Sequence, residues 1–393
     1  MSLLPDIDIV AEIRNRDAGC EPERLALKYS AMRASAFAFL RGTSHLFYAR
    51  LASHPALPAA PAVMACGDLH LENFVATGQG PQGLFYSVND FDECLLAPVW
   101  WDCLRGASSI YVARKKLGLD KAGAKVLVAE FVLEFARQLQ AGLPDDVAPV
   151  TPRSAGRAAL NKAMAARTEV VRGKLALRVD GTYALPASAH ERRSVRACLA
   201  MVSLQRRGKV GLVVQDVARR VAGLASLGTR RFSVLALQGN SKPLLLDLKQ
   251  ARAPGGAALT GIAQPDWPCH AERVATIERL AEPALRRLPI AVGTPRNPMV
   301  LRKFWPREAR LHLAELGSGK ALQANVLRLA STAACLHLRC AGHFGAADLA
   351  ALAAFGASGG WRAEVTLQAI AMARQNKQDW RSFRKAFDGG AFA

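Results

Sequence analysis

Acidic and amide side chains gather in two short segments in the first quarter of the chain. The first segment, Met64-Ala-Cys-Gly-Asp-Leu-His-Leu-Glu-Asn-Phe74, carries Asp68 and Asn73. The second segment, Asn89-Asp-Phe-Asp-Glu93, follows another apolar run and carries Asp90. Phosphoryl transfer needs a carboxylate that receives the hydroxyl proton of the acceptor, and an Asn and an Asp that hold magnesium on the nucleotide phosphates. We therefore expect Asp68 to be a catalytic base, and Asn73 and Asp90 to be metal ligands.

Neighbouring polar residues have supporting roles in this interpretation. Asp92 is a candidate for a second metal ligand, with a structural hydrogen bond as the alternative. His70 is expected to brace the loop, and Asp102, in the segment Trp101-Asp-Cys-Leu-Arg105, to orient the loop from the beginning of a helix. An interpretation without chemistry stays open, because Asp and Asn also favour turns and helix caps through local hydrogen bonds.

The character of the chain changes near residue 209. Three strand-like runs follow, at residues 213–218, 231–238 and 243–249. The loop between the first two runs is rich in small residues, so its backbone N–H groups could approach phosphates. We expect Gly223, Ser226 and Gly228 to take part in nucleotide binding there.

Lys249 ends the third of these runs. In protein kinases the lysine that pairs with the nucleotide phosphates lies on the third strand after a Gly-rich loop, and we predict this role for Lys249. A helical run begins near His270 and offers Glu272 or Glu278 as the carboxylate partner of the lysine. Although 159 positions separate them in sequence, Lys249 and Asp90 are expected to face the same cleft.

The two acidic segments resemble the catalytic and metal loops of aminoglycoside phosphotransferases, choline kinases and other protein-kinase-like enzymes. The matching residues are Gly67-Asp-Leu-His70 with Asn73, and Asp90-Phe-Asp92. This resemblance implies a two-lobed α+β fold, ATP and magnesium as cofactors, and transfer of phosphate to a hydroxyl acceptor that is a small molecule or a protein. In these enzymes the small β-rich lobe precedes the catalytic loops, whereas here the matching segments follow them.

A circular permutation explains this order. Residues 326–337 resemble the helix that normally leads directly into the catalytic loop, yet they lie near the C-terminus. Permutation is tolerated where the original chain ends are close together at the surface. The expected organisation is therefore the first part of a large helical lobe at 1–208, a small nucleotide-binding lobe at 209–306, and the second part of the large lobe at 307–393.

The order of motifs over residues 25–345 also resembles a bacterial family, the domain of unknown function 2252. The similarity rests on Met32-Arg-Ala-Ser-Ala-Phe-Ala-Phe-Leu-Arg-Gly42, Cys66-Gly-Asp-Leu-His70, Asn89-Asp-Phe-Asp-Glu93 and the run from Arg219 to Lys249. The chain departs from the usual pattern of this family at Ala36, where proline is usual, and at Ala225, where glycine is usual. The Cβ of Ala225 narrows the backbone options of the loop. Resemblance to this family implies nothing about the substrate.

Composition gives the broad class of the protein. Of its 393 residues, 51% are hydrophobic and 21% are charged, as in an ordinary soluble globular protein. The formal net charge of +20 favours anionic ligands or partners such as nucleotides, nucleic acid and anionic surfaces. The eight Cys residues show no metal-binding spacing, no apolar run is long enough to span a membrane, and the first residues do not form a secretion signal. We therefore expect a cytoplasmic protein.

Two other classes of function stay open. The same fold could serve a nucleotide-binding regulator, or an enzyme that transfers AMP instead of phosphate. In the other alternative the acidic loops are structural, and the protein binds nucleic acid or an anionic surface without catalysis. This alternative is not favoured, because no basic ribbon with interleaved aromatic residues stands out. The basic charge also favours an anionic or neutral acceptor over a cationic one.

Overall fold

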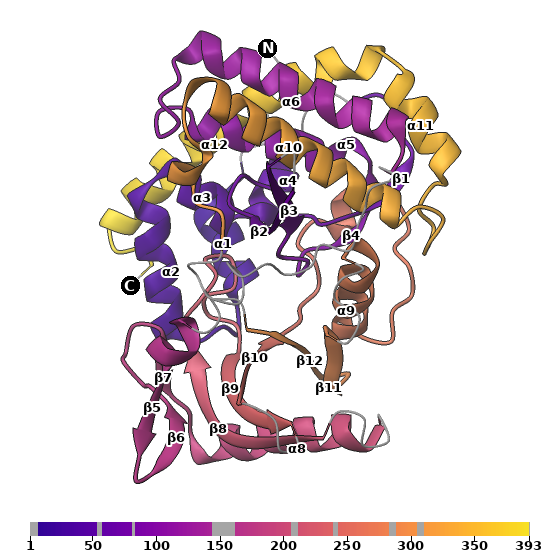
Figure 1. Cartoon of the computed structure of the whole chain (residues 1–393). Coiled ribbons are helices and arrows are strands. Elements are labelled where there is room, and N and C mark those ends of the chain that lie inside the picture. Colours follow the sequence, from indigo (N-terminus) through magenta and orange to yellow (C-terminus); the bar gives the residue numbers. More distant parts are fainter. Residues whose placement is uncertain are drawn as a thin grey trace.

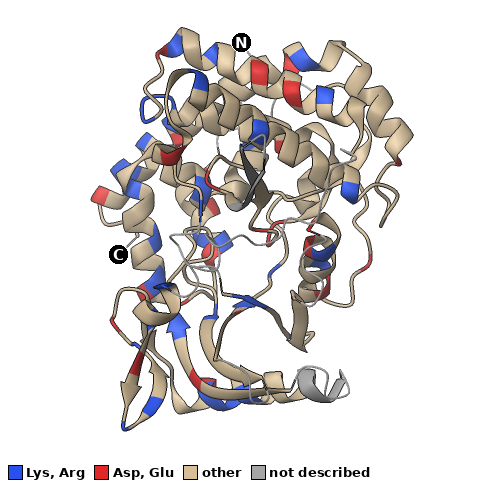
Figure 2. Ribbon diagram, viewed as in Figure 1, with Lys and Arg blue, Asp and Glu red and all other residues tan. Residues whose placement is uncertain are grey.

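Helices and strands occupy different parts of this mixed α+β protein, which we describe from a computed structural model (Figure 1). The structure describes residues 7–52, 57–80, 83–143, 162–205, 211–238, 243–282, 288–304 and 310–392. Lys and Arg residues are spread over both the helical part and the sheet part (Figure 2). None of the helices in the described ranges has the length and apolar character that crossing a membrane requires.

The helical part is built around α5. The nine α-helices of this part in the described chain are α1 (Ile9–Asp17), α2 (Pro22–Ala34), α3 (Ala36–Gly42), α4 (Ser44–Ala52), α5 (Trp100–Ala113), α6 (Lys121–Ala141), α10 (Gly319–Arg339), α11 (Leu349–Ala357) and α12 (Gly360–Asp388). Every residue of α5 except Val112 is buried, which is typical of a helix covered on all sides. Its neighbours include α6 and α12, so segments that precede and follow the sheet part in the sequence enclose it.

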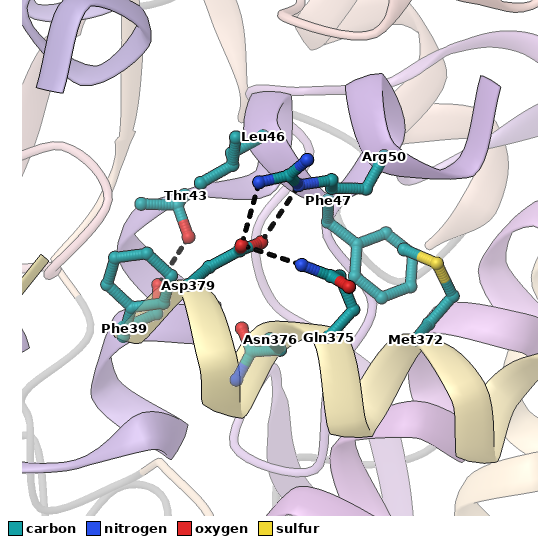
Figure 3. Close-up of a pocket in the computed structure, with 9 residues that line it drawn as sticks. All are labelled: Phe39, Thr43, Leu46, Phe47, Arg50, Met372, Gln375, Asn376 and Asp379. Atoms are coloured by element: carbon teal, nitrogen blue, oxygen red, sulfur yellow. Dashed lines mark hydrogen bonds and ion pairs between the residues drawn. The ribbon is translucent and has the colours of Figure 1, made fainter. Parts of the chain in front are cut away.

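The N-terminal helices pack on the end of α12. Ile13, Tyr29, Met32, Phe39 and Phe383 form one apolar cluster there. A buried ion pair also joins α4 to α12, as Figure 3 shows. Nη2 of Arg50 lies 2.9 Å from Oδ1 of Asp379, and the side chain of Gln375 donates to the same carboxylate. These contacts fix helices that are far apart in the sequence.

Two short antiparallel pairs carry the acidic segments. β1 (Ala62–Ala65) pairs with β4 (Leu95–Pro98), and β2 (Phe74–Gly80) pairs with β3 (Gly83–Val88). The loop at 66–73 therefore connects β1 to β2, and the loop at 89–94 connects β3 to β4. Because Ala65 lies opposite Leu95 and Phe74 lies opposite Val88, the two loops lie beside each other.

The sheet part consists of six antiparallel strands in the order β11-β12-β10-β9-β8-β7. They are β7 (Ala184–Pro186), β8 (Leu212–Arg220), β9 (Arg231–Gln238), β10 (Leu244–Gln250), β11 (Ile290–Thr294) and β12 (Asn297–Lys303). On one face, Val195 and Leu199 of α8 (Ala189–Gln205) join an apolar cluster with sheet residues such as Phe232 and Leu246. α9 (His270–Ala281) packs against β11 and β12. A hairpin of β5 (Thr168–Val171) and β6 (Lys174–Leu177) lies beside β8.

The elements that matter for the site agree with the sequence expectations. The strands predicted at 213–218, 231–238 and 243–249 are confirmed as β8, β9 and β10. The helix expected near His270 is confirmed as α9, and residues 326–337 lie within α10.

Candidate functional site

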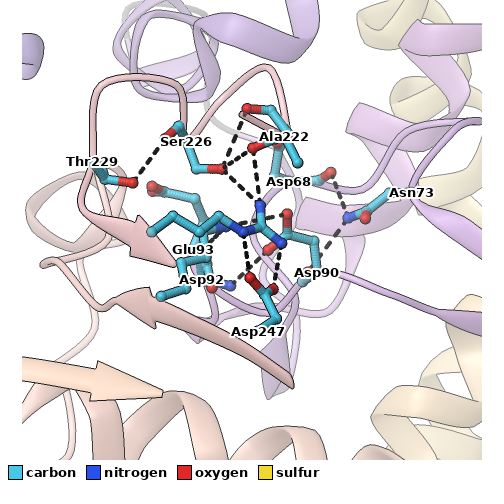
Figure 4. A network of polar contacts seen from close by, with 12 residues as sticks. Asp68, Asn73, Asp90, Asp92, Glu93, Ala222, Ser226, Thr229 and Asp247 are labelled. Carbon is cyan, nitrogen blue, oxygen red and sulfur yellow. Dashed lines mark hydrogen bonds and ion pairs between the residues drawn. The ribbon is translucent and has the colours of Figure 1, made fainter. Parts of the chain in front are cut away.

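A cleft lies where the two acidic loops, the end of β10 and the N-terminal helices meet. It encloses about 640 Å³ of empty space, part of which is open solvent, and its lining includes Asp68, Asp90, Asp92, Ser226, Thr229 and Lys249. Figure 4 shows the acidic side chains converging from the loops, with Ser226 and Thr229 on the loop that precedes β9. We call this space the central cleft. The prediction that Lys249 and Asp90 face the same cleft is confirmed.

The loop that carries Asp68 is held in shape from beneath. Gly67 has a φ of +79°, and a Cβ at this position would collide with the carbonyl oxygen of Glu93, so only glycine fits. The carboxylate of Asp102 accepts hydrogen bonds from the backbone N–H groups of Cys66 (2.7 Å) and Gly67 (3.0 Å). Nε2 of His337 lies 3.0 Å from the same carboxylate. Asp102 therefore orients the loop from the beginning of α5, as expected.

Asp68 is buried and paired with an arginine. Nε of Arg105 donates to Oδ1 of Asp68 at 2.9 Å, and a second guanidinium nitrogen contacts the same oxygen. Burial raises the pKa of Asp68 to about 7, against the opposing attraction of Arg105. A carboxyl group that titrates near neutral pH is suited to accept a proton in general-base catalysis.

Asn73 connects the two acidic loops. Its side-chain nitrogen donates to the backbone carbonyls of Asp68 (3.1 Å) and Asp90 (3.4 Å). Both hydrogen bonds use the amide nitrogen, which leaves the side-chain oxygen as the atom suited to hold a cation. His70 braces the first loop, because its Nδ1 accepts a hydrogen bond from the backbone N–H of Glu72 at 3.1 Å.

Lys249 meets the second acidic loop from the end of β10. Its Nζ contacts Oδ2 of Asp92 and lies 3.7 Å from Oδ2 of Asp90. Burial lowers the pKa of Lys249 to about 8, although Asp90 opposes this. Burial alone would raise the pKa of Asp90, but Lys249, Arg302 and other nearby arginines outweigh it and lower the value to about 2. Asp90 is therefore ionised at neutral pH, and an aspartate has to be ionised to bind a metal ion.

Asp92 is engaged by two cations. Its Oδ2 contacts Lys249, and its Oδ1 lies 3.1 Å from the guanidinium of Arg302. Arg302 also pairs with Glu278 of α9, with 2.7 Å between Nε and Oε2. Both oxygens of Asp92 take part in this network, as the structural alternative for Asp92 expects. Its role as a second metal ligand stays a prediction.

The expectation for Glu272 needs correction. Within the described residues, the ion pairs of Lys249 are with Asp90 and Asp92, and Glu272 makes none with it. Six residues separate Glu272 from Glu278, so their side chains point about a third of a turn apart on α9. The helix buries Glu278 beside Arg302 and leaves Glu272 partly exposed.

The small-residue loop borders the cleft and makes hydrogen bonds within itself. Ser226 and Thr229 line the cleft, but their backbone N–H groups donate to carbonyls within the loop, at Gly223 and Ser226 respectively. Gly228 serves packing, because a Cβ there would lie 2.8 Å from the Leu25 side chain of α2. The hydroxyls of Ser226 and Thr229 also donate to loop carbonyls, Ser226 to those of Ala222 and Gly223 and Thr229 to that of Ser226. Phosphate binding by Gly223, Ser226 and Gly228 stays a prediction.

Sequence reasoning missed the arginines of the site. Arg105 lies one turn after Asp102 on α5. This spacing places it on the same side of the helix as Asp102, and could have indicated that Arg105 also reaches the loop. Arg231 donates to Asp247 through Nε (2.8 Å) and to the carbonyl of Ala222 through Nη1 (3.0 Å), and so fixes the base of the small-residue loop. Local sequence patterns carried no signal for this contact.

Comparison with known proteins gives one match. The model of a family described as uncharacterized protein conserved in bacteria (DUF2252) matches residues 20–155 and 145–386. No curated protein and no solved structure matches the chain.

Proposed function

The chain belongs to this bacterial family, and we propose that it is an ATP- and magnesium-dependent phosphotransferase that acts on a hydroxyl acceptor. One observation carries the proposal. Lys249 and Asp90 approach within 3.7 Å from segments far apart in the sequence, and Asn73 and the buried Asp68 line or border the same cleft. A base, an amide oxygen, an ionised carboxylate and a lysine are the groups that phosphoryl transfer requires.

The side chains suggest a division of roles. Lys249 and the small-residue loop with Gly223, Ser226 and Gly228 would hold the nucleotide phosphates. Asp68 would accept the proton of the acceptor hydroxyl, and Arg105 keeps its carboxylate in place.

The oxygen donors fit magnesium bound together with a nucleotide. Asp90 and Asn73 offer a carboxylate and an amide oxygen, which are the hard ligands that this ion prefers. Within the described ranges, no group of three or more His, Cys, Asp or Glu side chains could hold a metal by itself. Magnesium is usually bound by one or two carboxylates plus substrate phosphates, so a site of two protein ligands is consistent with it. The ion would neutralise phosphate charge there.

The course of the chain supports a permuted kinase-like fold. In kinase-like enzymes a helix leads directly into the catalytic loop. Here α10 ends beside that loop, because His337 contacts Asp102. After α10 the backbone N–H of Ala347 donates to the carbonyl of Ala62 in β1 at 2.8 Å. The helix and the loop are thus neighbours in space although the chain connects them in another order.

Two measurements test the proposal. Titration of the protein with ATP, with and without magnesium, should show binding that depends on Lys249 and strengthens in magnesium. Asp90→Ala should remove the magnesium-dependent part of the affinity and leave a folded protein. Glu364→Ala, on an exposed position of α12, is the matched control and should bind as the parent does. Equal magnesium-dependent affinities for Asp90→Ala and the parent would refute the metal assignment.

The reaction itself is tested with ATP labelled separately at the α and γ phosphorus. Transfer of the γ label supports phosphotransfer, whereas transfer of the α label would replace it with AMP transfer. Asp68→Asn should lower the rate roughly 10²- to 10⁴-fold, the usual range for loss of a general base, with nucleotide affinity little changed. Full activity in this variant would make Asp68 structural. Salt-sensitive retention of RNA or DNA without any transfer would favour the nucleic-acid alternative.

A further inference from the structure

The N-terminus of α4 opens onto the central cleft. Gly42, Ser44 and His45 all line the cleft at this point. Thr43, the residue before α4, donates its hydroxyl back to the carbonyl of Phe39 at 2.6 Å, as Figure 3 shows. The first N–H groups of a helix have no partner within the helix, and together with the helix dipole they favour an anion.

His45 gives a second and independent sign of a ligand. The residue is only 8% exposed. Its Nε2 is buried and has no hydrogen-bond partner in the described part of the chain. A buried polar atom without a partner is costly, by about 1–3 kcal/mol. Such an atom in a cleft wall indicates a group that binds there.

The wall around His45 is positively charged. Arg252 donates to Sγ of Cys20 (3.1 Å) and to the carbonyl of Arg16 (2.7 Å), which are neutral acceptors. Lys28 and Arg16 also line this wall, but they are paired with the carboxylates of Asp17 and Glu93. Within the described residues, Arg252 is therefore the cleft arginine whose charge no carboxylate balances.

The chemistry of the imidazole agrees with this charge. Burial, and then Lys28, Arg16, Arg105 and Arg252, lower the pKa of His45 well below its ordinary value. His45 is thus a neutral imidazole that can donate one hydrogen bond, in surroundings where an anion is favoured.

We propose that the N-terminus of α4, His45 and Arg252 form a subsite for the anionic group of the acceptor. The acceptor class is then a small hydroxyl compound that carries a phosphate or carboxylate group. The position favours the acceptor over the nucleotide, because α4 packs on Arg105, the residue that holds Asp68: the guanidinium carbon of Arg105 lies 4.8 Å from the centre of the Phe47 ring in α4. Lys249, proposed to hold the nucleotide, belongs to the sheet part. Arg252 follows β10 in that same part, so the N-terminus of α4 and His45 carry the assignment to the acceptor. The assignment to the acceptor rests on the proposed function, whereas the anion subsite does not.

The test uses the full-length protein and probes that differ in charge. The imidazole NMR signals of His45, identified by their loss in His45→Gln, are followed during titration with inorganic phosphate, glycerol 3-phosphate, glycerol and choline. Phosphate and glycerol 3-phosphate should shift these signals, and glycerol and choline should not. Loss of one hydrogen bond to a charged group corresponds to roughly tenfold or more in affinity. We expect this decrease for phosphate in Arg252→Gln, and no change in the control His343→Gln, at an exposed position.

Two results would overturn the proposal. The subsite is wrong if phosphate leaves the His45 signals of the parent protein unchanged. The acceptor assignment is wrong if magnesium and ATP displace glycerol 3-phosphate from His45 instead of binding together with it. Phosphate binding at His45 in a protein that binds no ATP would refute the proposed phosphotransfer and keep the anion subsite. The two failures are therefore distinguishable.

Discussion

Replacement of Asp102 by asparagine should destabilise the protein strongly although the two side chains have the same shape. The carboxylate is 1% exposed. Its Oδ2 accepts a hydrogen bond from the N–H of Cys66, and its Oδ1 from the N–H of Gly67. Whichever way the asparagine amide is turned, its NH₂ group faces one of these N–H donors. One charge-assisted hydrogen bond is lost, and two donors are left buried against each other.

The magnitude follows from these contacts. Loss of a hydrogen bond to a charged group costs about 1.5–3 kcal/mol, and a buried donor without a partner costs a further 1–3 kcal/mol or so. The sum, about 2.5–6 kcal/mol, is a large fraction of the roughly 5–15 kcal/mol that stabilises a folded protein. Because the same hydrogen bonds shape the loop before Asp68, ATP turnover should decrease together with stability.

Urea unfolding followed by circular dichroism measures the effect. The midpoint should move to lower urea without a change in slope, since the surface exposed on unfolding stays the same. Asp120→Asn is the matched control, because Asp120 caps α6 at an exposed position through Gly123 and asparagine caps helices equally well. A decrease of less than about 1 kcal/mol for Asp102→Asn would show that the buried carboxylate does not hold the loop.

Three further predictions follow from the same structure. With a pKa of about 7 for Asp68 and about 8 for Lys249, ATP turnover should rise about fivefold from pH 6 to pH 8, because Asp68 ionises while Lys249 loses about half of its charge. A rate independent of pH across this range would exclude the role of Asp68. Gly67→Ala should lower the free energy of unfolding, measured by denaturation, by at least about 3 kcal/mol. Gly118→Ala, where φ is also positive but nothing lies within 4 Å of the added Cβ, should lower it by only about 1–2 kcal/mol. Equal effects would show that a Cβ at position 67 does not collide with the carbonyl of Glu93. Asp379→Ala should lower the free energy of unfolding by about 3–5 kcal/mol, because it leaves the charge of Arg50 buried. The double variant with Arg50→Met and Asp379→Leu should have nearly the stability of the parent. A double variant as unstable as the single one would show that the ion pair itself is required.

Local signals were enough to predict much of the candidate site. Asp68, Asn73 and Asp90 stand next to apolar runs and turn residues, which mark the ends of short strands in a single sequence. The strands that end at Gln238 and Gln250 are equally local, since each is a short and mostly apolar run. The ends of these strands depend on residues that are close in the sequence, so the pattern of residue types was enough to predict them.

The ion pairs of the site could not be predicted in this way. Arg302 reaches Asp92 across 210 positions in sequence, and the wall formed by His45 and Lys28 depends on how the N-terminal helices pack. Residue types set helix propensity but not the partner of a buried charge. Among the described residues, Lys249 pairs with Asp90 and Asp92 and not with Glu272 or Glu278, and Glu278 pairs with Arg302 instead. Which face of α9 packs on the sheet becomes visible only in three dimensions.

The burial of α5 on all sides has a consequence for how the protein is made. Helix α12, which covers α5, and helices α10 and α11, which pack on α6, belong to residues 319–388 (Figure 1). The sheet part has its own apolar cluster. During synthesis the sheet part can therefore fold while α5 and α6 still expose apolar surface, and the helical core closes only when residues 319–388 have left the ribosome. A chain that stops at residue 318 should aggregate when it is produced, and co-expression of residues 319–393 should return it to the soluble fraction. The order of elements along this chain thus delays the support of the loop that carries Asp68 until residues 319–388 have been made.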